Sequence, residues 1–111
     1  MFALWYNRDM EVTSFPFFSS FEDDGYAAVV RIGREESRTV IILTLLLPQL
    51  DRSGREDDSS VELCLNGSWE KHYLRKAKVI ENSSRRARVR LRIEKEGEVR
   101  SFHLRFGTIA V

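Results

Sequence analysis

The chain has 111 residues, of which 42% are hydrophobic and 32% charged, and its formal net charge is +1. This composition is typical of a single globular domain over residues 1–111 and excludes a disordered chain. The lone cysteine, Cys64, excludes an intrachain disulfide, and the longest apolar run, 39–47, is too short for a membrane helix.

We expect no secretory signal at the start of this sequence, because Arg8, Asp9 and Glu11 follow the first apolar residues too closely. We therefore expect a cytoplasmic protein that does not contact a membrane.

Period-2 alternation between turn residues recurs along the chain, and no window of about a dozen residues has helical periodicity. We predict a mostly β domain, either an antiparallel β-sandwich, a jelly roll or a small barrel of about eight short strands. The strands are expected near residues 2–6, 10–15, 26–33, 38–47, 60–65, 69–80, 85–95 and 98–106. A short helical turn is expected around 19–24. Residues 48–59, which are rich in charge, are expected to form a long surface loop.

The strand expected at 38–47 is apolar on both faces, whereas one face of a two-layer domain normally meets water. Val40, Ile42, Thr44 and Leu46 would face one way, and Ile41, Leu43, Leu45 and Leu47 the other. The cover could come from the aromatic N-terminal region, which contains Phe17 and Phe18, or from a second copy in a homodimer. The predicted apolar interface consists of Ile41, Leu43, Leu45, Leu47, Phe17 and Phe18.

Two hairpins are predicted in the second half of the chain. A three-residue loop at 66–68 would pair Leu65 with Trp69, and a two-residue Asn66-Gly67 turn is the alternative. A turn at 96–97 would pair strands 85–95 and 98–106, with Leu91 opposite Phe102 on an apolar face.

Charge is divided unevenly along the chain. Residues 1–70 contain 6 basic and 13 acidic side chains, whereas residues 71–111 contain 12 basic and 4 acidic ones. In the predicted C-terminal hairpin, the face opposite the core would present six basic side chains, with Arg88 directly opposite Arg105. These six are Arg86, Arg88, Arg90, Arg92, His103 and Arg105.

Three explanations of these cations remain open. They could form a solvated face that is balanced by acidic residues of the first 70. They could bind a nucleic-acid backbone, although His103 is the only ring among them on which a base could stack. They could also dock an acidic protein surface such as the Glu56-Asp57-Asp58 loop of another copy. The leading prediction is a non-enzymatic binding module whose arginine-rich face docks an acidic protein or nucleic acid. The alternative is an assembly protein that acts through apolar self-association.

Catalytic chemistry has little support in the sequence. A reactive pair would require Cys64 and His72 on neighbouring strands, but Cys64 lies between two leucines, as an inert small hydrophobe does. No metal-ligand spacing of Cys or His and no glycine-rich phosphate loop occurs. We therefore predict no catalytic residues, no metal and no cofactor.

Overall fold

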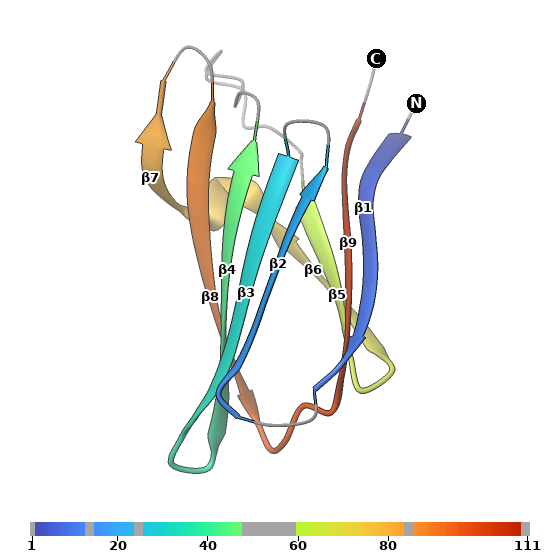
Figure 1. Cartoon of the computed structure of the whole chain (residues 1–111), viewed down its shortest axis with the longest axis vertical. Helices are drawn as coiled ribbons and strands as arrows, with labels where there is room; N and C mark the ends of the chain where they lie inside the picture. The colour runs from blue at the N-terminus through green and yellow to red at the C-terminus, as the bar shows by residue number, and fades with distance from the viewer. Residues whose placement is uncertain (1, 13–14, 24–25, 48–59, 84–85, 110–111) are drawn as a thin grey trace.

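The computed structural model describes residues 2–12, 15–23, 26–47, 60–83 and 86–109, and these residues form nine strands in two facing antiparallel sheets (Figure 1). The four-stranded sheet contains, in spatial order, β1 (Phe2–Glu11), β9 (Ser101–Ile109), β5 (Ser60–Leu65) and β6 (Ser68–Tyr73). The five-stranded sheet contains β2 (Phe17–Asp23), β3 (Tyr26–Glu35), β4 (Arg38–Leu47), β8 (Ala87–Glu96) and β7 (Lys78–Asn82). The predicted antiparallel β-sandwich is confirmed. The loop predicted at 48–59 lies outside the described residues.

The core lies between the sheets and is built from alternate residues of each strand. On β8, for example, Val89, Leu91 and Ile93 are buried while the residues between them face outwards. This period of two is what a strand with one face on a core requires. The inner faces of β3, β4, β5, β8 and β9 supply the largest fully buried side chains, which are Val30, Ile32, Ile41, Leu43, Leu45, Val61, Leu63, Val89, Phe102 and Leu104.

Three elements differ from the sequence expectation. The two strands expected near residues 2–6 and 10–15 are a single strand, β1, which ends at Glu11. The stretch 69–80 is not one strand, because a short 3₁₀ helix at Leu74–Lys76 ends β6 and carries the chain across to β7 in the other sheet. Leu74 of this turn is buried in the core, which fixes the crossover in place. The helical turn expected around 19–24 does not form over residues 19–23, which belong to the edge strand β2. Phe17 and Phe21 of this strand pack against the core.

The predicted C-terminal hairpin does not form. Strand β8 pairs with β4 and β7, whereas β9 pairs with β1 and β5 in the opposite sheet. Residues 97–100 carry the chain from one sheet to the other. Leu91 and Phe102 are both buried, as the apolar pattern required, but they enter the core from facing sheets and are not cross-strand partners.

The hairpin between β5 and β6 has the shorter of the two turns considered. Leu65 pairs with Ser68, so the loop is the Asn66-Gly67 dipeptide, and the three-residue alternative is wrong. Both turn residues have positive φ, 52° for Asn66 and 88° for Gly67, as a type I′ turn requires. The Asn66 side chain accepts hydrogen bonds from the backbone N–H groups of Arg100 (2.8 Å) and Ser101 (3.2 Å). The turn therefore anchors the segment that links the two sheets.

The doubly apolar strand is β4, the middle strand of the five-stranded sheet. Its inner residues Ile41, Leu43 and Leu45 are fully buried in the core. Its outer residues Ile42 and Leu46 are half-buried because strands β3 and β8 flank them on both sides. The aromatic N-terminal segment does not fold across this outer face, since β2 lies at the edge of the same sheet beside β3.

One ion-pair network joins the two sheets at their border. Glu70 on β6 pairs with Lys95 of β8 and, at 2.7 Å, with the imidazole Nε2 of His72. The Glu70 side chain is 24% exposed. Burial acts to raise the pKa of Glu70, but the hydrogen bonds and positive charges of Lys95 and His72 outweigh it and hold that pKa below its ordinary value of 4.5.

This lowered pKa predicts how Glu70 affects stability with pH. A carboxyl group whose folded pKa lies below its unfolded value stabilises the fold above the unfolded pKa and loses that effect as pH falls through the folded one. We expect Glu70→Gln to lower the free energy of unfolding at pH 7, and the gap to the wild type to close as pH falls below about 4.5. Urea unfolding of both proteins at neutral and acidic pH checks this, and an equal gap at both would contradict it.

Candidate functional site

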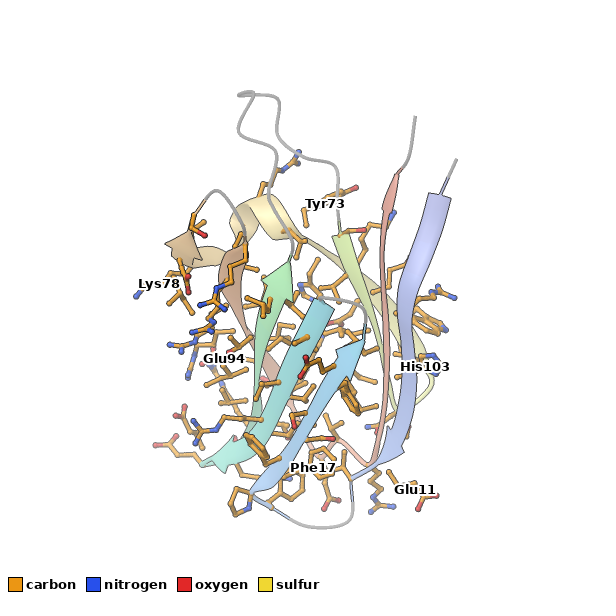
Figure 2. All side chains as sticks on the ribbon, turned by 45° about the horizontal axis from the view of Figure 1, so that its top comes forward. Glu11, Phe17, Tyr73, Lys78, Glu94 and His103 are labelled. Carbon is orange, nitrogen blue, oxygen red and sulfur yellow. The ribbon has the colours of Figure 1, made fainter. Side chains whose placement is uncertain are left out.

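The structure separates the six predicted basic residues into two groups. Arg88, Arg90 and Arg92 alternate along β8 on the outer face of the five-stranded sheet, as predicted, and Arg86 directly precedes that strand. His103 and Arg105 lie on β9, in the other sheet. In Figure 2, Lys78 and Glu94, which lie in the same sheet as the first group, are on one side of the molecule, and His103 of the second group is on the opposite side. The predicted opposition of Arg88 and Arg105 is therefore wrong.

Three of the six predicted cations already have carboxylate partners. Arg86 pairs with Glu81 at 3.1 Å, and Arg105 pairs with Glu62 at 2.8 Å. Arg92 lies between two glutamates of the same sheet, Glu35 at 3.0 Å and Glu94 at 3.1 Å. The hydrogen bond to Glu94, and the charge and hydrogen bond of Glu35, raise the pKa of Arg92 above its ordinary value. Internal balance by acidic residues thus accounts for three of the six predicted cations.

Other cations of the same outer face have no carboxylate partner among the described residues. Arg88 lies opposite Glu81 in the register, but the Glu81 carboxylate is bound to Arg86. Arg90 lies directly opposite Lys78, which places two positive charges on neighbouring strands. Arg31 of β3 is exposed and is separated from Arg92 only by Ile42 of β4.

These cations flank a strip of apolar surface on β4. The cross-strand register places Ile42 between Arg31 and Arg92, and Leu46 beside Arg88. The aliphatic stem of an arginine can cover apolar neighbours while its guanidinium stays in water. This outer surface, here called the arginine face, consists of Arg31, Arg88, Arg90, Arg92 and Lys78 around Ile42, Thr44 and Leu46.

A hollow of about 390 Å³ opens at one end of the arginine face. Val40, which is only 6% exposed, and the half-buried Ile42 contribute its apolar base next to Gly33. Arg31 and Arg92 line it from opposite sides, since Ile42 lies between them in the register. Phe18 of β2, which is 65% exposed, also lines the hollow. The hollow combines an apolar base with three arginines, Arg31, Arg34 and Arg92, and with the carboxylate of Glu35, which is paired with Arg92.

Most residues of the predicted apolar interface do not lie on the surface of the molecule. Ile41, Leu43 and Leu45 are fully buried between the sheets, so the prediction that they form an intermolecular surface is wrong. Phe17 packs half-buried against the core, and Phe18 alone among the described side chains of this set is highly exposed. The side chain of Leu47 lies outside the described set.

The outer face of the four-stranded sheet has a separate aromatic cluster. The guanidinium of Arg105 lies 3.9 Å from the centroid of the Trp69 ring, and the His103 ring lies 5.3 Å from Trp69. Cys64 lies between Trp69 and His103 in the register. The Cys64–His72 pair considered from the sequence does not form, because His72 lies opposite the buried Val61 and faces the other side of the sheet from Cys64.

Sequence reasoning missed Arg31, Gly33 and the hollow. The alternation of Val30, Arg31 and Ile32 did mark Arg31 as outward-facing. The sequence did not reveal that β3 and β8 lie on either side of β4, which is what brings Arg31 to the same face as Arg90 and Arg92. The sequence pattern therefore indicated that the Arg31 side chain faces outwards, but it did not indicate the order of the strands.

Within the ranges that the structure describes, no three His, Cys, Asp or Glu side chains come together as metal ligands. The same ranges contain no helix with the length and apolar character needed to cross a bilayer. Comparison with family models, with curated proteins and with solved structures finds no match to this chain.

Proposed function

We propose that the protein is a non-enzymatic binding module whose arginine face docks an acidic segment of a partner protein. The observation that carries this proposal is a group of neighbouring cations on the arginine face, Arg31, Arg88 and Arg90, that have no carboxylate partner among the described residues. Arg105 on the four-stranded sheet, by contrast, pairs with Glu62 and lies over the ring of Trp69. Like charges on neighbouring strands cost stability, and a docked anion would offset that cost.

An acidic protein segment suits this face better than a nucleic-acid backbone. The cations surround an apolar strip of Ile42 and Leu46, which can bury apolar side chains of a partner but gains nothing from phosphates. Among the described side chains of this face, Phe18 is the only exposed aromatic ring, so nucleic-acid bases would find little to stack on.

Self-association through the same face is less favourable. A two-fold dimer would place the same patch of each copy against the other, so Arg31, Arg88 and Arg90 of one copy would meet the cations of its partner. The apolar residues that first suggested a dimer are largely in the core.

The test compares three fluorescent probes at about 50 mM and about 200 mM salt: an oligoglutamate peptide, a duplex DNA and a heparin fragment. We expect the peptide to bind the wild type at low salt and to bind more weakly at high salt. Tighter binding of DNA than of peptide would show that the partner is a nucleic acid and that the protein-partner proposal is wrong. No binding of any probe at low salt would show that the arginine face is only a solvated surface.

A further inference from the structure

The hollow beside Arg31 exists because residue 33 of β3 has no side chain. Gly33 pairs with Val40 of β4, and its neighbours on the same face of β3 are Arg31 and Glu35. A Cβ atom built at Gly33 would meet no described atom within 4 Å. A side chain at this position would project into the hollow and occupy part of its volume.

Neither packing nor backbone conformation requires glycine at position 33. Positive φ among the glycines of the described residues is confined to Gly67 and Gly97, so Gly33 has an ordinary strand conformation. Glycine inside a strand weakens it, and such glycines often mark a place where a ligand approaches closely. The structural consequence of Gly33 is an open apolar base at the end of the arginine face.

The chemistry around the hollow defines what it can hold. Its base, formed by Val40 and Ile42, favours an apolar group, and the exposed ring of Phe18 can pack against one. Arg31 has no described carboxylate partner and can bind a carboxylate next to that group. A partner with an acidic residue beside a bulky apolar one complements both features, whereas a second copy of this face would bring cation against cation.

We propose that the hollow receives one bulky apolar side chain, aromatic or long aliphatic, from the acidic segment that docks on the arginine face. This inference rests on the proposed function and adds an anchor to it. A fully buried apolar anchor at the centre of a ring of polar contacts typically contributes a large share of binding energy.

The experiment uses three peptides of equal length: oligoglutamate, the same peptide with one central phenylalanine, and the same peptide with one central serine. We expect the phenylalanine peptide to bind the wild type about tenfold more tightly than the serine peptide. In amide NMR spectra, the phenylalanine peptide should shift the signals of Gly33 and Val40 clearly more than the serine peptide does.

Gly33→Val places a side chain in the hollow next to Val40, and it should clearly reduce the phenylalanine advantage. Because the added side chain enters open space on a strand, the variant should melt no lower than the wild type. Thr44→Val is the matched control, since it adds apolar surface to the same face outside the lining of the hollow and should keep the advantage.

The outcomes separate the anchor from the docking face. Equal binding of the phenylalanine and serine peptides to the wild type would overturn the anchor and leave the proposed function standing. Retention of the advantage in a folded Gly33→Val variant would also overturn it. If no peptide binds the wild type at low salt, the proposed function is wrong and the anchor is wrong with it. The wild-type peptide comparison decides the matter even if the variant does not fold.

Discussion

Leu45→Glu is expected to unfold the domain, whereas Leu46→Glu, one residue further along β4, is expected to leave it folded. Leu45 is completely buried, and its cross-strand neighbours Ala28 and Val89 are buried as completely. An ionised carboxylate at this position would lose its hydration without gaining a partner, at a cost of several kcal/mol. That cost is comparable with the whole stability of a typical small domain, which is about 5–15 kcal/mol.

Leu46 faces the other way, between Ala27 and Arg88 on the outer surface. A glutamate there can reach water and can pair with Arg88, so the fold should persist and the affinity for oligoglutamate should fall. Circular dichroism and thermal melting of both variants check the contrast. Unfolding of Leu46→Glu would show that the outer face of β4 is packed against something the single chain does not supply. A folded Leu45→Glu would contradict the position of the core.

The same pair of variants tests the predicted homodimer. If two copies associated through the outer face of β4, light scattering would show Leu46→Glu to be a monomer and the wild type a dimer. A wild type that is monomeric at high micromolar concentration would exclude self-association as the reason for the doubly apolar strand. Its position in the middle of the five-stranded sheet already explains much of that pattern.

The sequence predicted which residues face the core better than it predicted which strands are neighbours. Alternation on β8 correctly placed Val89 and Leu91 inside and Arg88 and Arg90 outside. The apolar match between Leu91 and Phe102 suggested a hairpin, but residues on facing sheets satisfy the same pattern as residues on adjacent strands. Burial is a local property of each strand, whereas strand order depends on contacts between distant parts of the chain.

The candidate site was only partly predictable for the same reason. Its arginines on β8 were found because they alternate within one strand, but Arg31 joins them only through the order β3-β4-β8. The apolar match between Leu65 and Trp69 favoured a three-residue loop at 66–68, but the turn is the two-residue Asn66-Gly67. Two successive residues that tolerate positive φ were the stronger signal.

Arg88→Gln and Arg90→Gln are expected to weaken binding of the acidic probe without weakening the fold. Arg90 lies opposite Lys78, so removing its charge should raise the stability by a few tenths of a kcal/mol or leave it unchanged. The double variant loses two charged contacts to the probe, and we expect its affinity for oligoglutamate at low salt to fall about tenfold. Its affinity should also depend less steeply on salt, because fewer ion pairs form on binding.

A further substitution serves as the matched control for this prediction. Arg105→Gln removes a cation that pairs with Glu62 on the four-stranded sheet, away from the arginine face, so it should leave the affinity unchanged and lower the stability slightly. Melting temperatures read beside probe affinities decide between a binding role and internal balance. If Arg88→Gln and Arg90→Gln clearly lower the melting temperature and leave the affinity unchanged, the arginines stabilise the fold and the proposed function is wrong.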